Sequence, residues 1–304
     1  MTRLLATLAL FALAACNRGG DGGRPVIALV PKTMNNPFFV DMERGARAAA
    51  DSLGLELVVQ AADREVDAER QLQIVENLIQ RRVAALLVVP SGSREIVPAI
   101  VKANAADVPV LVVDTRVDTA ALRAAGGRVA TFVGSDNVDG GRLAGRFVAE
   151  RLGGAGRVAV LEGVPGHESG DARLRGFREA LAASPGVTVV ASQPADMERD
   201  RAFQVMQNVL QAHPGVQAVF ACNDVMALGA VEAIAAAGKA GAVTVVGFDA
   251  QDDARAAIAA GRMHATVAQF PAEMGRQAVV SAYRLLKGEP VPAEQPVRIE
   301  LVTK

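Results

Sequence analysis

The first chemically distinctive stretch of the chain is "KTMNNPFF", residues 32–39, which directly follows the apolar run of residues 26–30. A lysine and two amides are costly in a buried core, and adjacent phenylalanines are unfavourable on a solvated surface. Together these side chains fit a site that holds a ligand with both polar groups and apolar faces. Asn36 is also placed to cap a helix whose first residue is Pro37.

Polar or aromatic side chains also follow the other apolar, strand-like runs of the chain. Ligands of open α/β sheets bind beyond the carboxyl ends of the strands, so polar strand ends from both halves of the chain predict one shared cleft. The strand ends that carry such groups are 32–39, Asp114-Thr115, the loop 163–173, residues 193–197, Asn223-Asp224, Phe248-Asp249 and Gln269.

The elements that must position these groups are strands and helices in alternation. Segment 67–82 has helical periodicity, with apolar residues at every third or fourth position. The strand-like runs are apolar on both faces, as is typical of a parallel sheet covered by helices. One series of such units covers residues 26–137 and a second series follows it. The sequence therefore predicts an α/β fold with two doubly wound, parallel-sheet lobes.

Composition and missing motifs exclude several classes of function. The 304 residues are 51% hydrophobic and 21% charged, with a net charge of −1, so no basic surface for nucleic acid is indicated. The three histidines lack metal-ligand spacing, and neither a P-loop nor a dinucleotide fingerprint is present. Ser169 lies one place late for a hydrolase nucleophile motif. We expect no catalytic residue, metal or cofactor, and no enzymatic activity.

The N-terminus, "MTRLLATLALFALAAC", has one arginine and then an apolar run too short to span a bilayer. Small residues before Cys16 match a bacterial lipoprotein signal, which predicts a signal peptide over 1–15 and a lipid on Cys16. The alternative is an ordinary secretory signal with an incidental cysteine. The glycine-rich segment 16–24 is expected to be a flexible tether. Cys222 then remains as a lone thiol in an apolar run, which indicates a core residue.

Over residues 25–303 the chain resembles the periplasmic monosaccharide-binding proteins of ABC importers, the ribose- and allose-binding group with the type I periplasmic binding protein fold. The resemblance is carried by "IALVPKTMNNPFFVDMERGARAAADSLG", "GSDNVDGGRLAG", "VASQPADM", "VTVVGFDA" and "ATVAQFPAEMG". It implies one lobe from 24–135 plus 270–298, a second from 136–269 plus 299–304, and a hinge of three crossing segments. Lactose-repressor relatives share the lobes but begin with a helix-turn-helix, where this chain has its signal sequence.

The resemblance also implies which side chains bind the ligand. A monosaccharide has hydroxyls around its edge, which planar polar side chains match, and weakly apolar faces, which aromatic rings cover. The positions that correspond to polar contacts are Lys32, Asn36, Asp114, Arg173, Asn223, Asp249 and Gln269, and those that correspond to ring packing are Phe38, Phe39 and Phe248.

Three positions depart from the pattern of ribose binders. Those proteins have an arginine where this chain has Thr115, and they have no lysine at the position that corresponds to Lys32. Many relatives have Phe or Trp where Met197 stands, and methionine packs on a sugar without a rigid ring. Arg116 is displaced by one residue, which should point it away from the cleft. The segments around these positions are closer to allose-binding proteins.

Other interpretations of single residues remain open at this point. Phe38 or Phe39 alone could be a core residue at the start of a helix. Arg173 could be a solvated helix residue, and Asp249 could be a helix cap.

The resemblance implies a monomeric solute-binding protein that captures a sugar by cleft closure and delivers it to an ABC permease. An allose-type hexose is the first expectation and ribose the second. The alternative is a sugar sensor that feeds a chemoreceptor or a sensor kinase. The expected location is the periplasm or the outer face of the cytoplasmic membrane, with the lipid on Cys16 as the membrane contact.

Overall fold

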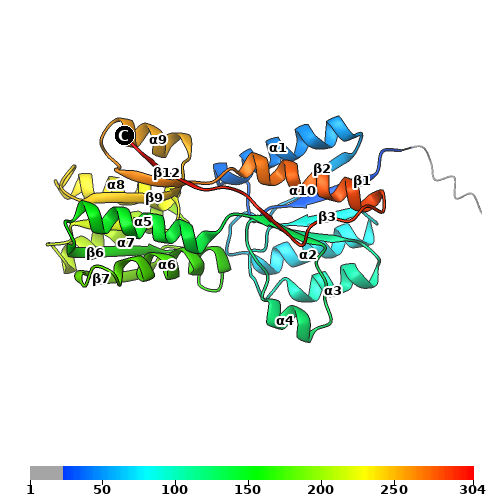
Figure 1. Cartoon of the computed structure of the whole chain (residues 1–304), viewed down its shortest axis with the longest axis horizontal. Helices are drawn as coiled ribbons and strands as arrows, with labels where there is room; N and C mark the ends of the chain where they lie inside the picture. Colours follow the sequence, from blue (N-terminus) through cyan, green and yellow to red (C-terminus); the bar gives the residue numbers. More distant parts are fainter. Residues whose placement is uncertain (1–22) are drawn as a thin grey trace, which may run out of the picture.

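The computed structural model describes residues 23–304, so Cys16 and the predicted signal peptide lie outside the described residues. The described chain forms two lobes, each with a six-stranded sheet and helices on both of its faces (Figure 1). The strand orders are β11-β5-β4-β3-β1-β2 and β12-β10-β9-β8-β6-β7. β12 pairs antiparallel with β10, and the other strand pairs are parallel. The predicted fold class is confirmed.

The first lobe contains β1 Val26–Val30, α1 Pro37–Leu53, β2 Glu56–Val59, α2 Ala68–Gln80, β3 Ala85–Val88, α3 Val97–Ala105, β4 Val110–Val113, α4 Thr119–Ala124, β5 Thr131–Gly134, α10 Pro271–Leu286 and β11 Glu294–Pro296. The second lobe contains α5 Asn137–Arg151, β6 Ala155–Glu162, α6 Glu168–Leu181, β7 Gly186–Pro194, α7 Arg199–Ala212, β8 Ala218–Ala221, α8 Asp224–Ala236, β9 Thr244–Asp249, α9 Asp252–Ala259, β10 Ala265–Ala268 and β12 Glu300–Thr303.

Strand β1 shows why both faces of the first sheet are covered by helices. Successive strand residues point to opposite faces, and all of Ile27, Ala28, Leu29 and Val30 are fully buried. Ile27 and Leu29 belong to the core beneath α1 and α10, whereas Ala28 and Val30 belong to the core beneath α2 and α3. A parallel sheet buried on both sides follows from this continuous apolar run.

Helix α1 begins as its sequence predicts. Asn36 is the N-cap and accepts a hydrogen bond from the Phe38 backbone N–H at 3.0 Å, and Pro37 is the first helical residue. The helix lies beside α10 at backbone contact, because a Cβ on Gly45 would stand 1.9 Å from the Ala272 carbonyl oxygen. This close packing binds α10, which follows β10 in the chain, to the first lobe (Figure 1).

The chain passes between the two sheets after β5, after β10 and after β11 (Figure 1). That the two sets of residues move as rigid lobes about these segments stays a prediction. Two short elements, α4 and β11, were not predicted from the sequence. Strand β11 consists of Glu294, Gln295 and Pro296, so it lacks the apolar pattern of a strand. Among residues 23–304, no helix combines the length and apolarity needed to cross a bilayer.

Candidate functional site in the cleft between the lobes

A small cavity of about 20 Å³ lies between the lobes. Both lobes supply buried side chains to it, so the cleft is closed around this space. The first-lobe wall consists of Lys32, Asn36, Phe38, Phe39, Glu65 and Asp114, and the second-lobe wall consists of Ser169, Arg173, Met197, Asn223 and Asp249.

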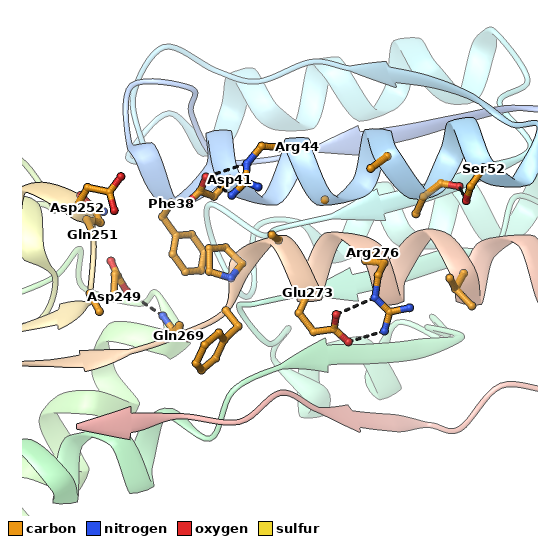
Figure 2. Close-up of a pocket in the computed structure, with 18 of the residues that line it drawn as sticks. Phe38, Asp41, Arg44, Ser52, Asp249, Gln251, Asp252, Gln269, Glu273 and Arg276 are labelled. Atoms are coloured by element: carbon orange, nitrogen blue, oxygen red, sulfur yellow. Dashed lines mark hydrogen bonds and ion pairs between the residues drawn. The ribbon is translucent and has the colours of Figure 1, made fainter. Parts of the chain in front are cut away.

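Three of the twelve residues proposed from the sequence stand behind this lining. The Thr115 hydroxyl donates to Asp114 Oδ2 at 2.8 Å. Gln269 Nε2 donates to Asp249 Oδ1 at 2.8 Å (Figure 2). The Phe248 ring lies 3.9 Å from the Arg173 guanidinium carbon, beneath its plane. These three side chains position charged groups of the lining, and their direct contact with a ligand stays a prediction.

The second-lobe wall is organised around Arg173, which projects from the first turns of α6. Its Nε donates to Asn137 Oδ1 at 2.8 Å, and its Nη1 donates to the Cys222 carbonyl at 2.7 Å. Nη1 also lies 3.6 Å from Asp249 Oδ1. Arg173 is 4% exposed, so the alternative of a solvated helix residue is wrong. The guanidinium is fixed before any ligand arrives.

Asp249 is held at the end of β9 in a strained backbone conformation, with φ of 113°. The cap of the following helix is Gln251, so Asp249 is not a helix cap. Positive φ values also occur at Asp114, Asp196 and Met197. Non-glycine residues in such conformations concentrate at functional sites, where the surrounding structure compensates their strain. Burial raises the pKa of Asp249 to about 7, although Arg173 and the Gln269 hydrogen bond oppose this shift.

The first-lobe wall contains an ion pair that the sequence did not reveal. Lys32 Nζ lies 3.7 Å from Glu65 Oε2, and both side chains are buried. Asn36 Nδ2 donates to Glu65 Oε1 at 3.0 Å. A buried lysine requires a counter-charge, so the prediction that Lys32 is buried already implied a nearby carboxylate. Nothing in the sequence identified that carboxylate as Glu65, in the loop after β2. Ser169, the other overlooked lining residue, lies beside Thr115.

Several buried polar atoms at the cleft have no hydrogen-bond partner among residues 23–304. They include Asp114 Oδ1 and Gln269 Oε1, which are acceptors, and Asn223 Nδ2, which is a donor. Asn223 Oδ1 accepts from the Met226 N–H at 2.8 Å and caps α8, which fixes the orientation of the amide. Buried polar atoms are normally paired, so these atoms indicate a ligand with both donors and acceptors.

Phe38 and Phe39 supply the apolar part of the wall. Their ring centroids are 5.3 Å apart at an interplanar angle of 89°. Both rings also belong to the core of the first lobe. The two interpretations of these residues are therefore compatible, because one face of a buried ring can pack on the core while another borders the cavity.

Polar contacts join the two lobes around the cavity. Gln251 Nε2 donates to Asn36 Oδ1 at 2.8 Å, and at the outer rim Arg64 pairs with Glu198 at 2.7 Å. Arg116 points away, as its position predicts, and makes two hydrogen bonds to the Glu294 carboxylate.

A larger open groove runs along α1 and α10 to the start of α9 (Figure 2). Two ion pairs lie along it, Arg44 with Asp41 at 2.9 Å and Arg276 with Glu273 at 2.6 Å. The cavity between the lobes, whose lining contains the partnerless Asp114 Oδ1 and Asn223 Nδ2, is the stronger candidate for a ligand site.

Residues 27–290 match the family model of the periplasmic binding protein domain, and the chain belongs to this family. The ribose import binding protein RbsB of Escherichia coli (strain K12) is 41% identical over 304 residues, which are 100% of this chain and 99% of that protein. The D-allose-binding periplasmic protein of the same organism is 38% identical, over 90% of this chain and 89% of that protein.

Solved structures agree with this assignment. An ABC transporter periplasmic solute-binding protein from Actinobacillus succinogenes 130z, with bound D-allose, superimposes with a TM-score of 0.88. It is 38% identical, and the match covers 92% of this chain and 98% of that one. The resemblance drawn from the sequence motifs is confirmed. These relatives are described as binding proteins of transport systems, and none of the three as an enzyme.

Proposed function

We propose that this protein captures a monosaccharide in the cavity between its lobes and delivers it to the permease of an ABC importer. The observation that carries the proposal is the pair of buried, partnerless atoms Asp114 Oδ1 and Asn223 Nδ2, which belong to the same lining as the phenylalanine rings. Vicinal hydroxyls can donate to the carboxylate oxygen and accept from the amide, and the rings can cover a face of C–H groups.

The Lys32–Glu65 pair gives the site a means of selecting its sugar. At 3.7 Å the two charged atoms are too far apart for a good hydrogen bond to each other. A ligand hydroxyl between them can accept from the ammonium and donate to the carboxylate. A sugar without a hydroxyl at this point leaves both charges less well paired, which weakens binding. We favour an allose-type hexose over ribose for this reason, and the relatives' names include both sugars.

Import is favoured over sensing, because the Escherichia coli relatives are named as an import binding protein and a sugar-binding periplasmic protein rather than as parts of a sensor. A sensor for a chemoreceptor or a kinase would use the same cleft residues. Transport of labelled sugar into cells that carry or lack the gene distinguishes the two. Normal uptake without the gene would contradict the import function.

We propose a periplasmic monomer anchored through a lipid on Cys16. The family to which the chain belongs supports the periplasmic location. A Cys16→Ser variant is expected to move from the membrane fraction to the soluble fraction while its sugar affinity stays unchanged, because the glycine-rich segment 16–24 separates the anchor from the cleft. Equal soluble amounts of both forms would contradict lipidation.

A thermal-shift screen of aldoses, ketoses and polyols at equal concentration tests the sugar assignment. A ligand that binds the folded state raises its stability according to its concentration divided by Kd. The largest shift is expected with a hexose of the allose type, and a smaller one with ribose. A larger shift with ribose would contradict the role given to Lys32 and Glu65. No shift with any sugar or polyol would contradict the proposed function.

A further inference from the structure

The imidazole of His167 is buried where the two lobes meet, although it is not one of the residues that line the cavity. It precedes Glu168, the first residue of α6, and belongs to the second lobe. Two groups of the first lobe, the Ser91 backbone and the Lys32 ammonium, lie close to the imidazole. The adjacent Glu168 N–H donates to Ser93 Oγ of the first lobe at 3.2 Å. His167 is therefore 3% exposed because the cleft is closed.

A positive charge on His167 is incompatible with this closed arrangement. Its Nδ1 has no hydrogen-bond partner among the described residues, so an added proton would create a buried donor without an acceptor. Burial and the repulsion from Lys32 lower its pKa to about 2, although the Ser91 backbone acts in the opposite direction.

The carboxylates near His167 do not offset this effect. Glu168 and Asp171 lie in the first turn of α6, and burial raises the pKa of both carboxyls. Glu65 of the first lobe is paired with Lys32 and stabilised by Asn36. The Lys32 ammonium is thus the charge that acts on the imidazole from across the cleft.

We propose that His167 couples sugar binding to pH, because the imidazole must be neutral for the lobes to close. The inference rests on the proposed capture of sugar by cleft closure. Opening moves Ser91, Ser93 and Lys32 away with the first lobe, which exposes the imidazole to water. In water an imidazole has its ordinary pKa of about 6.5, so mild acid holds the open form and releases the sugar.

Calorimetry with the sugar identified by the screen, at pH 7.5 and pH 5.5, tests this coupling. If protonation of the open form competes with closure, the affinity of the wild-type protein falls about tenfold more than that of His167→Asn over this range. Asparagine keeps a neutral polar group at the start of α6. Asp249 titrates in both proteins, so its contribution cancels in the comparison. His213→Asn, at the end of α7, is the matched control and is expected to keep the wild-type pH dependence.

A titration followed by NMR measures the same coupling without a variant, because the chain has three histidines whose signals can be separated. His167 is expected to titrate near pH 6.5 without sugar and to remain neutral down to about pH 4.5 with saturating sugar. The same pKa for His167 in both states would overturn the inference even if sugar binds well at pH 7.5. No binding of any sugar at pH 7.5 would instead overturn the proposed function.

Discussion

The two walls of the cavity hold their polar groups in different ways. In the second-lobe wall, Arg173 is fixed by Asn137, the Cys222 carbonyl and Asp249, and the Asn223 amide is fixed as the cap of α8. In the first-lobe wall, Lys32 and Glu65 are 3.7 Å apart, which leaves hydrogen-bonding capacity on both. A wall whose groups are fixed in advance binds with little loss of entropy, whereas a loosely paired wall can distinguish ligands by how well they complete it. We therefore expect the second-lobe wall to determine affinity and the Lys32–Glu65 pair to determine selectivity.

The largest effect on affinity is expected from Arg173→Ala. The change removes charged donors from the fixed wall and leaves Asp249 without its cation. Hydrogen bonds to charged groups contribute about 1.5–3 kcal/mol each, so the loss of two corresponds to at least about 100-fold weaker binding. Calorimetry measures this change. Arg116→Ala, which removes an arginine paired with Glu294 outside the cavity, is the control and should leave the affinity unchanged. A loss of less than tenfold in Arg173→Ala would contradict the dominance of the second-lobe wall.

A smaller loss is expected from Asp114→Asn in the first-lobe wall. The amide preserves the shape and can still accept the Thr115 hydrogen bond, but the partnerless carboxylate oxygen loses its charge. The loss of one charge-assisted hydrogen bond corresponds to about tenfold weaker binding. Asp118→Asn, at the N-cap of α4, is the control, because Asp118 lies in the same segment between β4 and α4. If Asp114→Asn weakens binding more than Arg173→Ala does, the comparison of the two walls is reversed.

The sequence predicted most of the site residues that lie at strand ends. It did not predict the site residue that a loop brings to the cavity, or the direction in which side chains point. Lys32, Asn36, Phe38 and Phe39 lie within one short segment, so a single strand-to-helix turn brings them together. Glu65 escaped detection because its loop reaches the cavity by way of a bridge between Thr33 and Ala62, which has no sequence signal.

Phe248 shows a second limit, because the resemblance implied a ring that packs on the ligand but the sequence did not show which way the ring points. Its side chain is fully buried beneath Arg173, while the next residue, Asp249, lines the cavity. Successive strand residues point to opposite sides, so one strand end can present only one of the two. Residue types alone do not indicate which of the two side chains faces the cavity.

A change in selectivity is expected from Glu65→Gln. The amide can still accept from Asn36, but it removes the counter-charge of Lys32. An imperfectly paired buried group costs about 1–3 kcal/mol, so the preference for the best hexose over ribose should fall by about tenfold. Affinities for both sugars, measured by calorimetry, give this ratio. Glu198→Gln at the rim is the control. An unchanged ratio in Glu65→Gln would show that the first-lobe wall does not select the sugar through this pair.

The smallest effect is expected from the rim, where Arg64 and Glu198 join the lobes outside both walls. Their ion pair is 2.7 Å long but has 55% and 37% exposed side chains, so water and salt screen it. Arg64→Ala should change the equilibrium affinity by no more than about twofold. Release of sugar, followed by stopped flow at low and high salt, should differ between the wild-type protein and Arg64→Ala at low salt and converge at high salt.

The matched experiment at the rim is the double variant Arg64→Ala with Glu198→Ala. If the two residues act through their mutual ion pair, the double variant should release sugar as fast as either single variant. A tenfold or larger loss of affinity in any of these variants would show that the rim forms part of the binding wall. A screened surface contact could not produce a loss of that size. The rim would then contribute to affinity together with the second-lobe wall.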